Sequence, residues 1–217
     1  MAKSIECVSL DLWNTLFEPN PEYAIARTEY LSQEFNLPAA EVLIKYREAK
    51  KLADLISENG GIALNREDIY NMLAHIMGSC RNPFYIASRL EKLFFTYPPI
   101  VRNNVIDIIN QLEEKDCSVR IISNTNFISG FTILHYLRTI KLQIAGIFSD
   151  IEGIAKPNPQ IFERCYNNSF PKDKIIHIGD SARCDIRGAT SYGIKSVLIE
   201  GPHKLYDVLK EIYDANL

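Results

Sequence analysis

Apolar and polar positions change their spacing along the chain, and each change predicts a different kind of element. Residues 4–10, SIECVSL, form a short apolar run that stops at Asp11, which predicts a buried strand. Between Pro19 and Tyr97 the apolar positions recur at helical intervals. Four helices are expected, over 21–35, 38–61, 65–78 and 82–97, with Asn65 as an N-cap. Four successive helices without an intervening strand predict a compact helical bundle.

Beyond Pro99, strands and helices alternate. The expected strands are 118–123, 145–149, 174–179 and 195–199. The expected helices are 101–114, a segment around 130–139, one that begins at Pro157, 184–192 and 203–215. This alternation predicts a parallel sheet covered on both faces. The predicted fold class is therefore α/β: a Rossmann-like, doubly wound parallel sheet at 1–16 and 98–217, with a helical-bundle cap domain inserted at 17–97.

Composition narrows the functional classes. Apolar residues make up 47% of the 217 residues and charged residues 24%, as in ordinary soluble proteins. The net charge of −3 gives no reason to expect a nucleic acid or an anionic membrane as partner. The chain has no apolar run long enough to span a bilayer and no secretory signal at its N-terminus. Five scattered cysteines without a C-x-x-C pair favour reduced core residues. We therefore expect a cytoplasmic protein.

Polar residues stand at or just past the ends of the predicted strands. Asp11 ends the first strand and Ser123 the second, Lys156 precedes a helix, and Asp180 follows the strand IIHIG with Asp185 five positions later. In a doubly wound sheet, ligands bind at the carboxyl ends of the strands. These side chains are therefore expected to meet in one crevice.

Each of these residue types suits one part of a displacement at phosphorus. A carboxylate such as Asp11 can act as a covalent nucleophile. Hard oxygen ligands for Mg²⁺ would come from three carboxylates, Asp11, Asp180 and Asp185. Lys156 would neutralise negative charge on the nucleophile and the transferred group. The Ser123 hydroxyl and the main-chain N–H of Asn124 could hold the remaining oxygens.

Four segments in order, DLWNT, IISN, AKPNPQIF and GDSARCD, resemble the four motifs of the haloacid dehalogenase-like (HAD) hydrolase superfamily. The helical insertion after the first motif is similar to the helical cap of that family. The resemblance implies that Asp11 is the nucleophile and that Ser123 and Lys156 bind the transferred group. It also implies a Mg²⁺ site with four ligands or supporting groups: Asp11, Asp180, Asp185 and the main-chain carbonyl of Trp13. The substrate would be a small phosphorylated metabolite, and the protein a monomer or homodimer.

Trp13 departs from the family pattern, because the phosphatases of the family carry there an aspartate that acts as general acid and base. An indole N–H only donates and does not titrate in the useful range. Three interpretations remain open. The first is a phosphatase that finds its proton elsewhere or uses good leaving groups. The second is a dehalogenase-type hydrolase, since that branch also carries an aromatic residue here. The third is a domain that binds a phosphorylated ligand or a protein with little turnover.

Other polar residues are ambiguous from sequence alone. Basic side chains on the expected cap helices could meet an anionic substrate, although most should face solvent: Arg27, Lys45, Arg47, Lys50 and Lys51. The turn at 57–68, SENGGIALNRED, is the expected specificity element of the cap. His177 lies within a predicted strand and is interpreted as a packed core histidine.

Overall fold

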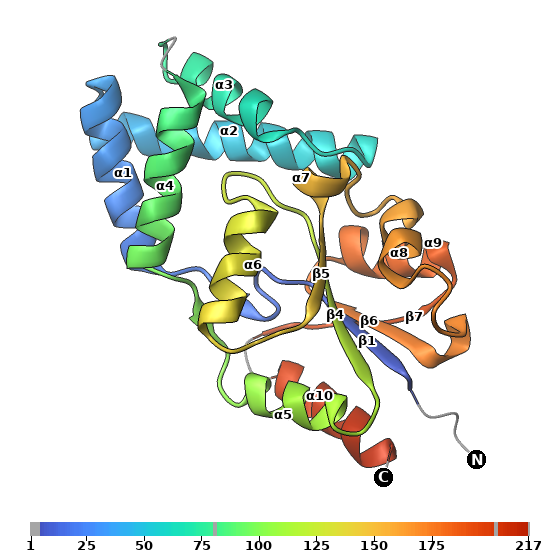
Figure 1. Cartoon of the computed structure of the whole chain (residues 1–217). Helices are drawn as coiled ribbons and strands as arrows, with labels where there is room; N and C mark the ends of the chain where they lie inside the picture. The colour runs from blue at the N-terminus through green and yellow to red at the C-terminus, as the bar shows by residue number, and fades with distance from the viewer. Residues whose placement is uncertain (1–4, 80–81, 202–203, 217) are drawn as a thin grey trace.

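A five-stranded parallel sheet forms the centre of the computed structural model, which describes residues 5–79, 82–201 and 204–216 (Figure 1). The strands are β1 (Cys7–Leu10), β4 (Ser118–Ser123), β5 (Ala145–Phe148), β6 (Ile175–Gly179) and β7 (Lys195–Leu198). They lie in the order β5-β4-β1-β6-β7, with Leu10 of β1 opposite both Ile121 of β4 and Ile178 of β6. The chain first adds strands on one side of β1 and then on the other, so the topological switch point lies between β1 and β6.

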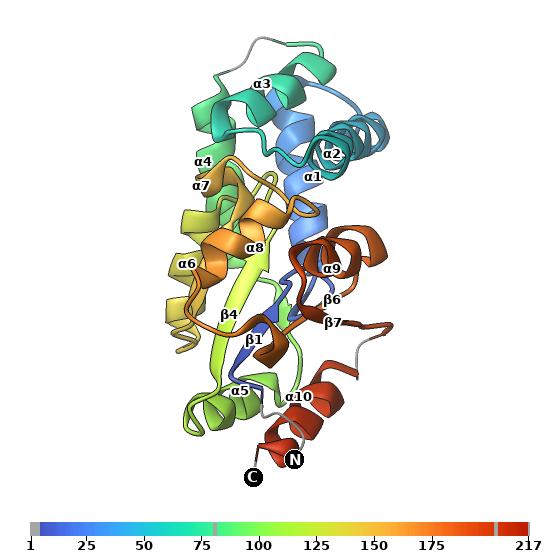
Figure 2. The same ribbon diagram turned by 90° about the vertical axis from the view of Figure 1, so that its right-hand side faces the viewer.

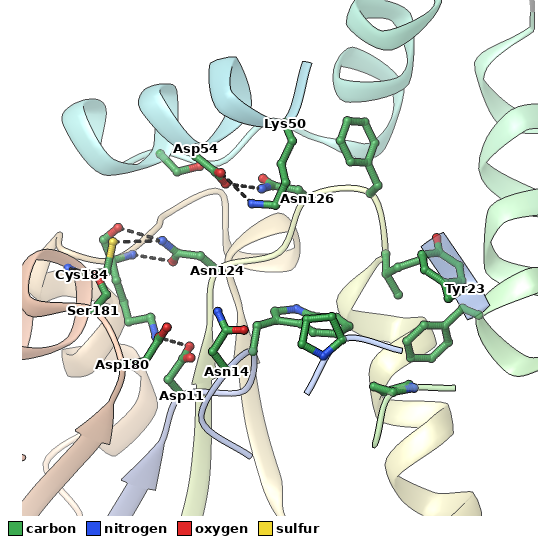
Figure 3. A pocket seen from close by; sticks show the side chains of 18 of the residues that line it. Asp11, Asn14, Tyr23, Lys50, Asp54, Asn124, Asn126, Asp180, Ser181 and Cys184 are labelled. Atoms are coloured by element: carbon green, nitrogen blue, oxygen red, sulfur yellow. Dashed lines mark hydrogen bonds and ion pairs between the residues drawn. The ribbon is translucent and has the colours of Figure 1, made fainter. Parts of the chain in front are cut away.

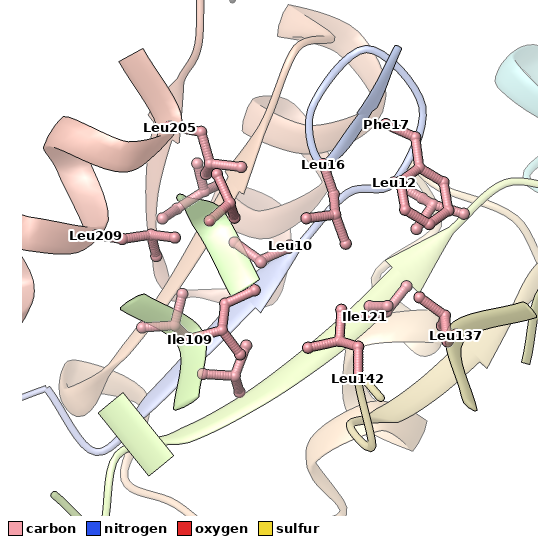
Figure 4. Close-up of a cluster of buried hydrophobic side chains, with 14 of the residues drawn as sticks. Leu10, Leu12, Leu16, Phe17, Ile109, Ile121, Leu137, Leu142, Leu205 and Leu209 are labelled. Carbon is pink, nitrogen blue, oxygen red and sulfur yellow. The ribbon is translucent and has the colours of Figure 1, made fainter. Parts of the chain in front are cut away.

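Helices cover both faces of the sheet, which confirms the predicted α/β class. Alternate side chains of β1, Val8 and Leu10, pack into a cluster that α5 (Val105–Glu113), α6 (Gly130–Thr139) and α10 (Lys204–Ala215) complete (Figure 4). Cys7 faces the other way and packs under α8 (Pro159–Tyr166) and α9 (Gly188–Tyr192). A strand buried on both faces is rich in apolar residues, and Ser9, the polar exception in β1, is buried with its hydroxyl hydrogen-bonded.

Four helices, α1 (Pro21–Phe35), α2 (Ala39–Gly60), α3 (Arg66–Ile76) and α4 (Pro83–Thr96), form the predicted insertion. They have a hydrophobic core of their own that includes Leu31, Ile69, Leu73 and Leu90. Asn65 caps α3 as expected, because its side chain accepts a hydrogen bond from the Asp68 N–H. Figures 1 and 2 both place this helical layer beyond one end of the sheet, away from α5 and α10.

The segment Gly61–Ala63, which follows α2, is hydrogen-bonded to the core. The Ala155 N–H donates to the Gly61 carbonyl (3.0 Å) and the Ala63 N–H donates to the Gly153 carbonyl (3.3 Å). This short antiparallel contact lies directly before Lys156 in the chain. The cap segment therefore helps to hold the loop that carries this lysine.

Some predicted element boundaries are wrong. The helix expected at 101–114 begins at Val105, because Ile100–Val101 forms a short strand, β3, antiparallel to β2 (Phe17–Glu18). Isoleucine and valine are β-branched and favour a strand, and Phe17–Glu18 supplies the partner. The first strand begins at Cys7, and Ile5 and Glu6 lie before it. The helix expected from Pro157 begins at Pro159, where the Asn158 side chain caps it.

Other differences are additions or fall on residues that are not described. A short helix, α7 (Ser149–Glu152), was not predicted, and the helix expected at 184–192 begins with a π-helical turn at Ala182–Arg187. Parts of two predictions, at Ser4 and His203, lie outside the described residues, as does Cys80. The cysteines within the described ranges, Cys7, Cys117, Cys165 and Cys184, are buried and free. None of the described helices combines the length and apolar character that a bilayer crossing requires.

Candidate active site

A pocket of about 440 Å³ lies between the cap and the carboxyl ends of the strands (Figure 3). The candidate site residues of the four motifs that line it are Asp11, Trp13, Asn124, Lys156, Asp180 and Asp185. Ser123 is fully buried at the end of β4, where its hydroxyl donates to the Asn124 carbonyl (3.3 Å). Asp11 follows β1 and Asp180 follows β6, so the two carboxylates flank the switch point of the sheet.

Lys156 is the central cation of this pocket. Its side chain is only 1% exposed, and its Nζ donates to Asp11 Oδ1 and to Asp185 Oδ1, both at 2.6 Å. Burial alone would lower the pKa of Lys156, but the two carboxylates outweigh burial and raise it above the ordinary value. The ammonium group is therefore charged at every physiological pH and holds two acidic side chains in fixed positions.

The three clustered carboxylates carry more negative charge than one lysine balances. Asp11, Asp180 and Asp185 each offer an oxygen, and these oxygens all lie within 4.8 Å of one another. Burial and the charge of Asp185 raise the pKa values of Asp11 and Asp180, against the pull of Lys156. In Asp185, burial is outweighed by Lys156 and the His177 N–H, so its pKa lies below the ordinary value. A divalent cation with oxygen ligands fits this donor set and would relieve the repulsion.

The local backbone explains how Asp185 reaches Lys156. Asp185 lies in the π-helical turn after β6, and one of its oxygens accepts a hydrogen bond from the Ser181 N–H (2.9 Å). The same carboxylate packs directly over Gly179, where a Cβ would come within 2.2 Å of its Cγ. Glycine at the end of β6 is therefore required by the position of the carboxylate rather than by backbone strain.

Gly179→Ala is expected to displace Asp185 and with it the Lys156 ammonium group. We expect at least a 100-fold fall in turnover, since a shift of about 1 Å can cost that much, and a loss of about 1–3 kcal/mol of stability. The measurements are steady-state kinetics and urea unfolding. Gly60→Ala is the control, because its Cβ would meet only the flexible Ile62 side chain, at 3.2 Å. Equal behaviour of the two variants would contradict this account of Gly179.

A buried chain of hydrogen bonds supports Asp185 from below, and sequence analysis missed it. His177 Nε2 lies 3.1 Å from Asp185 Oδ1, its Nδ1 lies 2.7 Å from Ser9 Oγ, and Ser9 Oγ lies 2.5 Å from the Tyr166 hydroxyl. Burial lowers the pKa of His177, so the ring is neutral with one N–H. Since Asp185 only accepts, Nε2 carries that proton, Ser9 donates to Nδ1, and Tyr166 donates to Ser9. The sequence interpretation of His177 as a core residue omitted this role.

Asn124 uses its side chain to hold Lys156. Its amide nitrogen donates to the Lys156 carbonyl (2.9 Å), and its amide oxygen accepts from the Lys156 N–H (2.8 Å). This pair of bonds joins the loop after β4 to the loop that carries the lysine. The side-chain amide is therefore occupied by the protein, and binding of a ligand by the Asn124 main chain stays a prediction.

Trp13 forms part of the pocket wall. Its ring makes edge-to-face contacts with Phe17 and Phe94, at centroid distances of 6.1 and 6.5 Å. The ring is half-buried, and the pocket beside it remains open down to Asp11. Trp13 therefore borders the same cavity as Asp11 and does not fill it.

The cap contributes both acidic and basic groups to the pocket. Of the five basic cap residues singled out from the sequence, Arg27 and Lys50 line it. Lys50 Nζ donates to Asp54 (2.6 Å), and Asp54 also accepts from the Asn126 side chain (2.7 Å), which belongs to the core (Figure 3). From the expected specificity turn at 57–68, Ser57 and Glu58 line the pocket.

Comparison with known proteins agrees with this fold and arrangement of residues. A model of the haloacid dehalogenase-like hydrolase family matches residues 5–193, so the chain belongs to that family of hydrolases. A glyceraldehyde 3-phosphate phosphatase from Methanopyrus kandleri is 23% identical over 208 residues, which cover 90% of this chain and 84% of the relative.

Two solved structures share the fold. The HAD-hydrolase YfnB from Bacillus subtilis, bound to magnesium, superimposes with a TM-score of 0.76 at 16% identity. The alignment covers 96% of this chain and all of YfnB. A 2-haloacid dehalogenase from Pseudomonas syringae superimposes with a TM-score of 0.64 at 17% identity. That alignment covers 89% of this chain and 86% of the dehalogenase. The fold alone therefore does not determine which reaction this chain catalyses, and the chemistry of the site has to decide it.

Proposed function

We propose that this hydrolase is a magnesium-dependent phosphatase that acts on a small phosphorylated metabolite through an aspartyl-phosphate on Asp11. The observation that carries the proposal is the arrangement of Asp11, Asp180 and Asp185 around Lys156 on the floor of the pocket. The relative named as a glyceraldehyde 3-phosphate phosphatase and the magnesium-bound structural neighbour support it.

The chain's own residues account for the two displacements. An Asp11 oxygen attacks phosphorus, forming one P–O bond while the bond to the leaving oxygen breaks, and water then cleaves the aspartyl-phosphate to restore Asp11. Lys156 holds the Asp11 carboxylate in place and offsets charge on the transferred group. Asp11, Asp180 and Asp185 would hold Mg²⁺, which supplies further positive charge for the phosphoryl oxygens. The Trp13 carbonyl remains the proposed fourth protein ligand.

Trp13 determines which leaving groups such a site can handle. The side chain at position 13 cannot give a proton to the leaving oxygen, and the loss of a general acid costs about 10²–10⁴-fold. The leaving groups of acyl phosphates, phosphoanhydrides and aryl phosphates are stable anions that depart without protonation. We therefore propose that the enzyme prefers these over alkyl esters.

The site favours this reaction over the two alternatives. Displacement of halide from carbon needs no metal ion, so a dehalogenase would have no use for three crowded carboxylates, two of which have raised pKa values. A domain that only binds its ligand would have no use for a nucleophile at the end of the pocket, and Trp13 leaves the approach to Asp11 open.

The test is phosphate release from a panel of acyl, aryl and alkyl phosphates, with Mg²⁺ or with EDTA. We expect turnover that requires Mg²⁺, is highest on acyl and aryl phosphates, and is lost in Asp11→Asn. Asp107→Asn, an exposed acid on α5, is the matched control and should behave like the wild type. Absence of phosphate release across the panel, or release that survives in Asp11→Asn, would refute the proposal.

A further inference from the structure

Arg27 of α1 lines the cap side of the pocket and has an unusual set of neighbours. Its guanidinium carbon lies 3.7 Å from the centroid of the Tyr46 ring and 5.6 Å from that of Tyr23. Its Nε is buried and has no hydrogen-bond partner. In the described part of the chain, no carboxylate forms an ion pair with it.

Two other cations line the pocket, and both are already neutralised. Lys156 is paired with Asp11 and Asp185, and Lys50 is paired with Asp54. Among the described residues that line the pocket, Arg27 is therefore the cation without a carboxylate partner, and its guanidinium interacts with the neutral side chains of Tyr46 and Tyr23. The side chain is half-buried at the pocket wall, so an anion bound in the pocket could pair with this charge directly.

Other arginines with a buried and unbonded Nε show that this atom alone is not informative. Arg66 forms an ion pair with Glu91, Arg102 donates to the Gly201 carbonyl, and Arg120 donates to the Cys165 carbonyl. Each therefore has a carbonyl or carboxylate acceptor elsewhere on its guanidinium. Arg27 differs in that its guanidinium lies against tyrosine side chains.

A second unpartnered polar group lies next to Arg27. The Tyr23 hydroxyl is buried without a hydrogen-bond partner, and Tyr23 lines the same pocket. Burial raises the pKa of Tyr23, so the hydroxyl keeps its proton and can donate. A donor and a cation side by side form a site for an oxygen-bearing anion.

An aromatic wall connects this corner to the reaction centre. Trp13 contacts Phe94 edge to face, and Phe94 contacts Tyr23 in the same way at a centroid distance of 6.4 Å. A ligand that reached from Asp11 to Arg27 would lie along these rings. Its middle section should therefore be apolar, with anionic groups at both ends.

We propose that the substrate carries a second anionic group, a carboxylate or a second phosphate, which binds Arg27 and the Tyr23 hydroxyl while its phosphoryl group lies at Asp11. This substrate class rests on the proposed phosphatase function. Arg27 would contribute to specificity through binding, because it has no part in the displacement at phosphorus.

The test compares hexyl phosphate with phosphonooxyhexanoate and hexanediol bisphosphate, and phenyl phosphate with carboxyphenyl phosphate. Within each set the carbon skeleton is the same, and only the second anionic group differs. Isothermal titration of Asp11→Asn gives dissociation constants without turnover, and wild-type kinetics gives kcat/KM. The variants are Arg27→Met, which keeps the aliphatic stem, Arg27→Lys, which keeps the charge, and Lys51→Met, an exposed cap lysine, as control.

We expect roughly 10–100-fold tighter binding of at least one doubly charged ligand, as for a hydrogen-bonded charge pair. The preference for the doubly charged over the singly charged ligand should fall below about threefold in Arg27→Met. It should survive in part in Arg27→Lys and persist in Lys51→Met. The carboxylate and bisphosphate ligands show which second group is preferred. Equal binding of single and double anions, or a preference that survives in Arg27→Met, would overturn the proposal. If no ester is hydrolysed but the Arg27-dependent preference is found, the phosphatase proposal fails while the anion site stands.

Discussion

Trp13→Asp is expected to raise the turnover of alkyl phosphates by about 10²–10⁴-fold, because it restores a proton donor beside the leaving oxygen. Acyl phosphates, whose leaving groups need no proton, should gain little. The new carboxylate would lie where the indole now lines the pocket with Asp11. Phosphate release from both substrate classes, measured side by side, provides the readout.

The control for this change is Trp13→Asn, which removes the same ring but cannot transfer a proton. Both variants lose the edge-to-face contacts with Phe17 and Phe94, so both should lose stability, by up to about 3 kcal/mol for this half-buried ring. If Trp13→Asn gains as much activity on alkyl phosphates as Trp13→Asp, the benefit comes from pocket size, and the missing-acid explanation is wrong.

Lys156→Met is expected to abolish detectable turnover and to lower the free energy of unfolding by about 3–5 kcal/mol, because it leaves two buried carboxylates without their partner. The stability measurement is urea unfolding in the presence of EDTA. Adding Mg²⁺ should recover part of the loss, since a cation that binds the folded state stabilises it.

Lys210→Met is the matched control for the buried lysine. Lys210 pairs with Asp214 on the exposed surface of α10, where ion pairs contribute little. We expect its free energy of unfolding to equal that of the wild type. A Lys156→Met protein as stable as Lys210→Met would show that the buried charges relax without their lysine.

Much of this fold could be predicted because its signals are local. The apolar run before Asp11, the helical spacing from Pro21 and the strand-end positions of Ser123 and Asp180 each depend on a few neighbouring residues. The parallel topology then brings distant strand ends together without further information. This is why the sequence alone predicts that the Asp11, Lys156, Asp180 and Asp185 side chains meet.

The parts that were not predicted depend on contacts between distant segments. Val101 was predicted as the start of a helix, whereas Ile100–Val101 pairs with Phe17–Glu18 as a strand. Arg27 and Lys45 look alike in sequence, yet Arg27 lines the pocket while Lys45 donates to the Ile76 carbonyl within the cap. Only the packing of α1 and α2 distinguishes the two cations.

The buried chain of hydrogen bonds from Tyr166 through Ser9 and His177 to Asp185 limits which substitutions the sequence tolerates. Each member donates to the next, so replacing one by an apolar residue leaves a neighbour with an unmet donor or acceptor in a dry interior. Neutral substitution at these positions therefore requires concerted changes on α8, β1 and β6. A residue exchange that is harmless in a relative with a different set of partners would be harmful in this chain.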